Sequence, residues 1–279
     1  GGSSTARVLG IECVTITLDP GPRYPGLSEP QAVARWARYY GSPGQGFEER
    51  SRVKQFEALG EPTLLSWSDG LAVRVAASEQ LSRAVYVSGT YEPNTLCVLE
   101  AVLRPGDCFI DVGANVGPVS LAASKWVGPS GCVFSFEAST REFDRLGDSI
   151  RHSGASNVTA VHAAVSSQAG YANLRVASAQ FAGLNSLGAS FAYPNVETVR
   201  VERVPAVTLD AFVSQHAITS LAALKVDVEG AEGEVLTGAS NVLSQLRPVI
   251  VMEVFSHALG TLQWSLERLQ RVLSGAGYE

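Results

Sequence analysis

The chain has 279 residues, of which 46% are hydrophobic and 17% charged, a balance that is typical of a globular protein and excludes a disordered or fibrous chain. The formal net charge is −6 and no block of Lys or Arg occurs, so we do not expect nucleic acid as the main partner. The four cysteines lack paired metal-ligand spacing, and the sequence contains neither a signal peptide nor an apolar run of about 18 residues. These features predict a cytoplasmic protein with reduced thiols and no membrane partner.

The first part of the chain is predicted to be a small unit distinct from the rest. Residues 1–4 are typical of a tag remnant and are left out of the fold prediction. The pattern of residues 5–88 predicts an α+β appendage that acts as a cap, a lid or the element of an oligomer. Its expected elements are a strand over 7–18, helices over 29–40 and 47–59, and a hairpin with strands over 63–67 and 71–75.

A strand, a glycine-rich turn and a helix follow one another near the middle of the chain. The apolar run 108–110 predicts a buried strand, which Asp111 ends. Gly113 and Gly117 then allow a sharp turn and a close approach of backbone to a ligand, and residues 119–126 resume a helical pattern. In doubly wound folds such a unit binds the nucleoside part of a cofactor at the carboxyl ends of the strands.

The turn itself limits the choice of cofactor. A dinucleotide site requires Gly-x-Gly-x-x-Gly, whereas only Gly113 and Gly117 are present here, and no Gly-Lys-Ser/Thr follows to form a Walker loop. Asp111 would repel a pyrophosphate but would attract a cation, such as the α-amino group of S-adenosylmethionine. The sequence therefore favours S-adenosylmethionine over a nicotinamide cofactor.

The remaining elements alternate between helices and strands. A helix over 94–103 precedes the central strand, and a strand over 132–136 ends in Glu137. The later expected elements are a helix over 140–152, a strand over 158–165, an antiparallel pair over 171–176 and 196–204 with a long loop over 177–195 between them, a helix over 209–216, a strand over 224–228, a helix over 230–246, a strand over 249–254 and a helix over 261–273. This alternation predicts an α/β fold with a mostly parallel sheet covered by helices on both faces.

Acidic residues follow several of these strands. Glu137 lies 24 positions after Gly113, close to the roughly 20-residue spacing at which a carboxylate binds a ribose diol. Asp227 is expected at the same sheet edge as Asp111, beside the methyl donor or the acceptor. Glu253 ends an apolar strand and needs a partner, because an unpaired buried carboxylate is costly. It would pair with a base, bind the acceptor, or join Asp227 in holding a divalent metal, although no further metal ligands are evident.

Two histidines are also candidates. His257 follows the strand that contains Glu253, so it would act as a general base for a hydroxyl acceptor or would be a plain surface residue. His162 ends an apolar strand and would be a packed residue or the edge of an adenine pocket.

Several motifs occur in order along the chain: Tyr91-Glu92-Pro93, Asp111-Val112-Gly113-Ala114-Asn115-Val116-Gly117, Phe136-Glu137, Asn185-Ser186, Thr208-Leu209-Asp210, Lys225-Val226-Asp227-Val228-Glu229-Gly230-Ala231-Glu232, and Glu253. Over about residues 89–256 they resemble the FkbM family of S-adenosylmethionine-dependent methyltransferases. The resemblance implies a Rossmann-like class I methyltransferase fold over 89–279 and, usually, methylation of an oxygen on a natural product, polyketide or sugar. The cofactor-binding candidates are Glu92, Asp111, Gly113, Asn115, Gly117, Glu137, Ala138, His162 and Asp227.

The chain departs from the family pattern in two places. Ala138 stands where family members usually have Pro, which alters a local turn. Class I methyltransferases also finish with an antiparallel strand pair, and this chain stops at Gly277-Tyr278-Glu279, where that pair would begin. We therefore expect either an excerpt of a larger protein, such as a synthase, or a missing strand pair that leaves a sheet edge exposed.

The sequence thus predicts an O-methyltransferase that uses S-adenosylmethionine and acts on a hydroxyl of a small molecule, free or bound to a carrier protein. The catalytic candidates are His257, Asp227 and Glu253, and a divalent metal is not the expected cofactor. The alternatives are transfer to nitrogen or carbon, and a non-catalytic module that binds the cofactor and a partner.

Overall fold

The computed structural model describes residues 4–8, 11–18, 52–60, 62–67, 70–191, 193 and 195–278. The helix predicted over 29–40 lies outside these residues. Of the helix predicted over 47–59, residues 52–59 are described, and residues 52–57 of these are helical.

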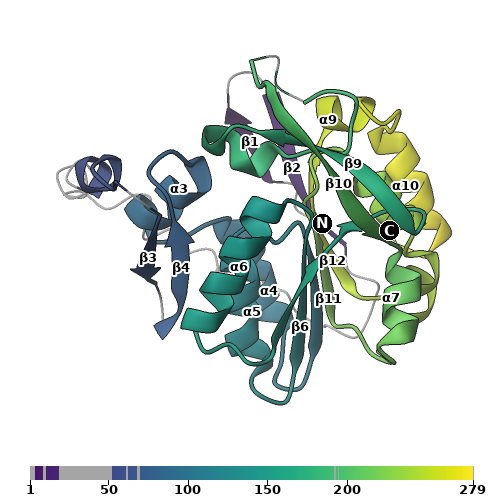
Figure 1. Ribbon diagram of the computed structural model, residues 1–279. Coiled ribbons are helices and arrows are strands. Elements are labelled where there is room, and N and C mark those ends of the chain that lie inside the picture. Colours follow the sequence, from purple (N-terminus) through teal and green to yellow (C-terminus); the bar gives the residue numbers. More distant parts are fainter. Residues whose placement is uncertain are drawn as a thin grey trace.

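A seven-stranded sheet forms the centre of the molecule (Figure 1). Its strands, in spatial order, are β1 (Ser4–Val8), β2 (Ile11–Leu18), β12 (Val249–Phe255), β11 (Ala223–Val226), β5 (Cys108–Val112), β6 (Cys132–Glu137) and β7 (Val158–His162). The five strands from β12 to β7 are parallel. Every residue of β5 and β11 is buried, as expected of parallel strands that are covered on both faces. The predicted Rossmann-like α/β fold is confirmed.

The N-terminal hairpin corrects two expectations. β1 and β2 pair with each other, and β2 pairs antiparallel with β12 over Leu18 to Cys13. Residues 4–18 therefore belong to the central sheet and not to a separate appendage, and Ser4 is part of a strand. The expectation of an exposed edge at β12 was wrong, because the N-terminal hairpin occupies the edge that the resemblance assigned to a C-terminal strand pair.

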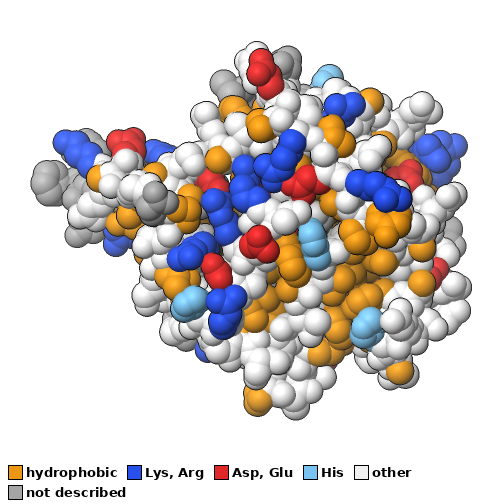
Figure 2. Space-filling model, viewed as in Figure 1, with side chains coloured by type: hydrophobic (Ala, Val, Ile, Leu, Met, Phe, Trp, Pro, Cys, Tyr) orange, Lys and Arg blue, Asp and Glu red, His pale blue; other side chains and the backbone are white. Residues whose placement is uncertain are grey.

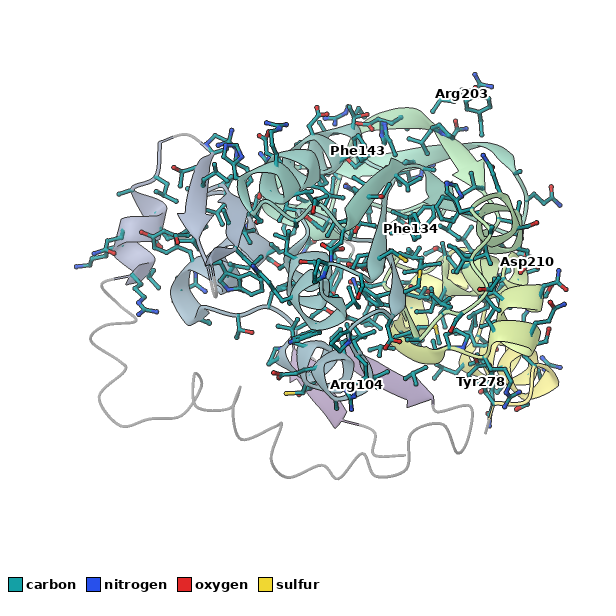
Figure 3. All side chains as sticks on the ribbon, turned by 90° about the horizontal axis from the view of Figure 1, so that it is seen from below. Arg104, Phe134, Phe143, Arg203, Asp210 and Tyr278 are labelled. Atoms are coloured by element: carbon teal, nitrogen blue, oxygen red, sulfur yellow. The ribbon has the colours of Figure 1, made fainter. Side chains whose placement is uncertain are left out.

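Helices cover both faces of the sheet, as Figure 1 shows. One side carries α4 (Pro93–Val102), α5 (Pro118–Val127) and α6 (Thr140–His152), and the other carries α7 (Leu209–Gln215), α8 (Glu232–Thr237), the π-helix η3 (Val242–Leu246), α9 (Ser256–Gly260) and α10 (Leu266–Gly275). Successive side chains of β5 point to opposite faces of the sheet. Phe109 therefore joins the hydrophobic cluster under α4 and α5, and Ile110 joins the cluster under α7, α8 and α10. Phe134 of β6, labelled in Figure 3, is half-buried against this second cluster, and its ring packs edge-on against Phe212.

Several boundaries differ from prediction. The helix predicted over 230–246 breaks at Gly238, where a Cβ atom would lie 2.1 Å from the Ser166 carbonyl oxygen. The last helix begins at Leu266 and not at residue 261, and the strand predicted over 158–165 divides into β7 and β8 (Ala164–Val165). Tertiary packing thus overrides the helical periodicity that runs through Gly238.

A second, three-stranded sheet has the order β8-β10-β9, with β9 (Gly170–Ala177) antiparallel to β10 (Thr198–Val207). The antiparallel pair predicted over 171–176 and 196–204 is confirmed. The segment between these strands is not all loop, because it contains the 3₁₀ helix η2 (Ala179–Leu184).

Residues 52–88 form a small unit that Figure 1 shows beside α6. It contains the predicted hairpin, β3 (Thr63–Ser66) and β4 (Ala72–Val75), and a helix that was not predicted, α3 (Gln80–Ser88). The Ala72 amide donates to Ser153 Oγ at 2.8 Å and the Arg74 amide to Ser149 Oγ at 3.0 Å, so the hairpin is fixed to α6. The domain boundary near residue 88 stays a prediction.

The surface in Figure 2 mixes charges of both signs. Among the described residues, Arg200 forms an ion pair with Glu202, and Arg145 with Glu79. Within the same part of the chain, none of the helices combines the length and the apolar character that a bilayer span requires.

Candidate cofactor and active site

A cavity of about 260 Å³ opens at the carboxyl ends of the parallel strands. Its floor comes from the turn after β5, the end of β6, the loop after β11 and Glu253 of β12, and its walls come from α3, β9 and η2. The predicted site residues in its lining are Gly113, Asn115, Glu137, Ala138, Asp227 and Glu253. This is the sheet edge at which doubly wound folds bind their ligands.

The turn after β5 is tightly packed against the loop after β11. The Gly113 and Ala114 amides both donate to the Phe136 carbonyl oxygen, at 3.0 and 2.9 Å. Gly113 has a φ of 83°, and a Cβ atom there would lie 1.8 Å from the Asp227 carbonyl oxygen. Only glycine satisfies both the backbone conformation and this approach. Gly117 caps α5 with a φ of 94° and is not part of the cavity lining.

Asp111 lies beneath the cavity and not in its lining. Its side chain is fully buried, Oδ2 accepts a hydrogen bond from Ser120 Oγ at 2.6 Å, and Oδ1 lies 3.6 Å from Lys225 Nζ. Burial raises the pKa of Asp111, and the positive charge of Lys225 opposes this effect. Asp111 therefore contributes charge and order from behind the floor, where direct contact with a ligand had been expected.

Glu137 is held in the floor by backbone donors. Its Oε2 accepts from the Asn115 amide at 2.9 Å and its Oε1 from the Ser139 amide at 2.8 Å. Burial raises the pKa of Glu137 to about 7, although these two hydrogen bonds lower it. Each carboxylate oxygen keeps a further lone pair with which to accept from a ligand hydroxyl.

Carboxylates gather at the other end of the floor. One oxygen each of Glu92, Asp227 and Glu253 lie within 4.8 Å of one another, a spacing at which three carboxylates could hold a divalent cation. Glu229 also lines the cavity, and burial together with the charge of Asp227 raises its pKa well above the ordinary value. The described side chains therefore bring four carboxyl groups close together here, and the raised pKa of Glu229 disfavours the ionised form of that side chain.

Lys225 is the basic residue of this floor, and sequence reasoning had not selected it. It is 3% exposed, lines the cavity and donates from Nζ to the Gly113 carbonyl oxygen at 3.0 Å and to Asp227 Oδ2 at 3.2 Å. Tyr91 and Glu229 were also missed as site residues, although both line the cavity. All three stand inside the motifs that carried the family resemblance, so the signal was present.

Neither predicted histidine lines the cavity. His257 lies on α9 and is exposed. The ring of His162 stacks on that of Phe143 (labelled in Figure 3) with centroids 4.5 Å apart, and its Nε2 is hydrogen-bonded to the Ala138 carbonyl oxygen at 3.1 Å. His162 thus packs behind Ala138, while a base role for His257 stays a prediction without support from its position.

The Asn185-Ser186 motif fixes the segment around η2 onto the cavity. Asn185 Nδ2 donates to Glu142 Oε2 at 3.1 Å, and its Oδ1 accepts from the Ala177 amide at 3.0 Å. Ser186 Oγ donates to the Glu229 carbonyl oxygen at 3.0 Å. These bonds explain why the motif occurs in a stretch that otherwise predicted a loop.

The Thr208-Leu209-Asp210 motif has a structural role at a distance from the cavity. Thr208 Oγ1 accepts from the Ala211 amide and caps α7. Asp210, labelled in Figure 3, accepts from the amides of Asn241 and Val242 at 3.0 and 2.9 Å. The motif therefore fastens α7 to the start of η3.

Glu232 also has a structural role, since it begins α8 and its Oε1 accepts from the Gly230 amide at 3.0 Å. It is 1% exposed, and burial raises its pKa to about 7 from an ordinary value of 4.5. Between these two pH values the folded state keeps a proton that the unfolded chain has released, so stability falls as the pH rises through this window.

Glu232→Gln is expected to remove this pH dependence, because glutamine does not titrate. The free energy of unfolding of the variant, relative to wild type, should rise by about 3 kcal/mol between about pH 4 and pH 8, as measured by urea unfolding. A difference that stays constant with pH would show that Glu232 is already ionised in the folded protein near pH 5.

Comparison with known proteins supplies a family. A model of the methyltransferase FkbM domain matches residues 111–279. No match was found among curated proteins.

Solved structures resemble the chain in part. Methyltransferase FkbM from Methylobacillus flagellatus is 13% identical, with a TM-score of 0.42, over 81% of this chain and 52% of that one. The precorrin-6y C5,15-methyltransferase from Geobacter metallireducens is 17% identical, with a TM-score of 0.40, over 68% of this chain and 74% of that one. The chain thus spans about half the length of the M. flagellatus protein.

Proposed function

We propose, from the premise that the chain belongs to the FkbM family of methyltransferases, that it methylates a hydroxyl oxygen of a small molecule. Methyltransferases of this class use S-adenosylmethionine, and the acidic lining of the cavity supports a donor with a net positive charge. The observation that carries the proposal is the acidic floor, in which Asp227, Glu229 and Glu253 line the cavity with Glu92 close to two of them, whereas Lys225 is the one basic residue among the described lining. A ligand with a net positive charge is favoured there, and an anionic dinucleotide is disfavoured.

The residues of the floor fit the parts of this donor. Glu137 has free lone pairs for a ribose diol, and Gly113 and Asn115 line the same cavity. Asp227 would face the cationic end. When bound, S-adenosylmethionine would supply a methyl group on a positively charged sulfur. An acceptor oxygen would attack the methyl carbon in line with the carbon–sulfur bond, and S-adenosylhomocysteine would leave.

The acceptor is proposed to lie under α3 and η2. Gln80 and Leu81 of α3 and Phe181 of η2 line the cavity opposite the acidic floor, and their mixed polar and apolar character suits a small organic molecule. Asp227 and Glu253 would take the proton from its hydroxyl, since both lie in the lining while His257 does not. Carboxylates in the lining support a hydroxyl oxygen over an amine nitrogen as the methylated atom, because a hydroxyl needs a base to remove its proton and an amine needs less help of this kind.

Calorimetry with S-adenosylmethionine, S-adenosylhomocysteine and NAD tests the cofactor. We expect both adenosyl ligands to bind, and NAD binding alone would overturn the proposal. A second assay follows methyl transfer from labelled donor to panels of small hydroxyl compounds and amines, with and without a chelator. Transfer only to amines would overturn the choice of oxygen, and loss of transfer with the chelator, restored by Mg²⁺, would assign Glu92, Asp227 and Glu253 to a metal.

The affinity for S-adenosylmethionine is expected to depend on the ionisation of Glu137. The raised pKa of Glu137, about 7, means that its carboxylate gains a proton as the pH falls through neutrality, and a neutral carboxyl is the weaker acceptor for a ribose diol. Affinity should therefore fall about tenfold from pH 8 to pH 6.

Glu137→Gln is the control for this effect, because it keeps the shape of the side chain and cannot titrate. Its affinity should be lower at pH 8 and should lose the step near pH 7. A step of unchanged size in the variant would assign the titration to another group.

A further inference from the structure

Lys225 has the contacts of a residue that organises the site through its neighbours. In the sheet it stands opposite Asp111, because β11 and β5 pair in that register. Its side chain crosses beneath the turn after β5 to reach the Gly113 carbonyl oxygen at 3.0 Å and Asp227 Oδ2 at 3.2 Å. One ammonium group thus joins two segments of the floor that are more than a hundred residues apart in sequence.

Two of the three protons of Lys225 are donated within the protein, to the Gly113 carbonyl oxygen and to Asp227 Oδ2. Asp111 Oδ1 lies 3.6 Å from Nζ and forms an ion pair with it that is too long for a hydrogen bond. The hydrogen bonds of Lys225 therefore go to groups that build the floor, so the geometry supports an effect on a ligand through these partners.

The charges around Lys225 depend on it in turn. Burial lowers the pKa of Lys225, but Glu92, Asp227 and Asp111 raise it by more, so the net pKa lies well above its ordinary value. Lys225 in turn lowers the pKa of Glu92, Asp111, Glu137 and Glu229, each of which burial raises. Without Lys225, these buried carboxylates would take up protons at higher pH.

We propose that Lys225 is the positioning residue of the donor site, which holds the Asp227 carboxylate in place in the cavity lining and ties it to the Gly113 turn. This inference rests on the proposed function, because it assumes that Asp227 faces a cationic donor.

The test compares Lys225→Met with Lys225→Arg by calorimetry with S-adenosylmethionine across about pH 5.5 to 8.5. Methionine keeps the length and apolar stem of lysine and removes its charge, whereas arginine keeps the charge. We expect Lys225→Met to bind the donor at least about tenfold more weakly at pH 7 and to shift the acid limb of the affinity profile up by about one pH unit. Lys225→Arg should keep the acid limb at the wild-type position, and Lys125→Met, an exposed site on α5, is the matched control.

The inference would be overturned if the plot of donor affinity against pH were the same for Lys225→Met as for wild type. It would also be overturned if Lys225→Arg showed the same pH shift as Lys225→Met. A purely structural role would weaken binding without moving the acid limb. If Lys225→Met fails to fold, the double variant Asp111→Asn/Lys225→Met is compared with the single variant Asp111→Asn. The double variant has a better chance of folding, because Asp111→Asn removes one of the buried acids that would otherwise lose their positive partner. Equal donor affinity in that pair would also overturn the inference. A wild-type protein that binds neither adenosyl ligand overturns the proposed function and this inference with it.

Discussion

Gly113→Ala is expected to disrupt the centre of the site and to abolish measurable donor binding. The added Cβ would lie 1.8 Å from the Asp227 carbonyl oxygen and 2.9 Å from its carbonyl carbon, which is backbone that cannot rotate away. The φ of 83° adds strain for any residue with a Cβ. We expect a loss of about 3–5 kcal/mol in the free energy of unfolding, at the upper end for one substitution, measured by urea unfolding together with calorimetry.

Two other glycines separate the causes of this effect. Gly106 has a φ of 93° with only Ser130 Oγ near its Cβ position, at 3.8 Å, so Gly106→Ala should show strain alone, about 1–2 kcal/mol. Gly147 lies inside α6 with no atom within 4 Å of that position, so Gly147→Ala should be neutral or stabilising. If Gly113→Ala cost no more than Gly106→Ala, the close packing of the turn on the loop after β11 would be refuted.

The arrangement of the floor could be predicted because strand polarity fixes it. Parallel strands bring their carboxyl ends to one edge, so short motifs at the ends of β5, β6 and β11 had to meet. Gly113, Glu137 and Asp227 accordingly line one cavity. The same logic failed for Asp111, because the residue lies within β5 and its side chain points beneath the edge and not across it.

Long-range packing decides the features that were missed. The pairing of β2 with β12 joins residues at opposite ends of the chain, and no local pattern of residues 11–18 specifies that partner. The break at Gly238 depends on the backbone of Ser166, and a buried lysine at position 225 is interpretable only when its acidic partners are in place. Periodicity predicts elements, whereas contacts of this kind require the fold.

Asp227→Asn is expected to change the selectivity between the methyl donor and its demethylated product. S-adenosylmethionine carries a positive sulfur that S-adenosylhomocysteine lacks, so a carboxylate facing that sulfur favours the donor. At about 5 Å and an effective dielectric constant of about 20, one such charge contributes about 3 kcal/mol. The variant should bind the donor about 100-fold more weakly and the product less than about threefold more weakly, by calorimetry at pH 8.

The ratio of the two affinities isolates charge from shape, because asparagine is nearly isosteric with aspartate and the two ligands differ by one methyl group. Lys225 strengthens the effect, since its Nζ now loses an anionic partner at 3.2 Å and its positive charge repels the donor more strongly. Asp144→Asn makes the same chemical change at an exposed position of α6 and should leave both affinities unchanged. An equal loss for the two ligands would mean that Asp227 supports the shape of the floor and does not face the sulfonium, and the charge argument would then pass to Glu92 and Glu253.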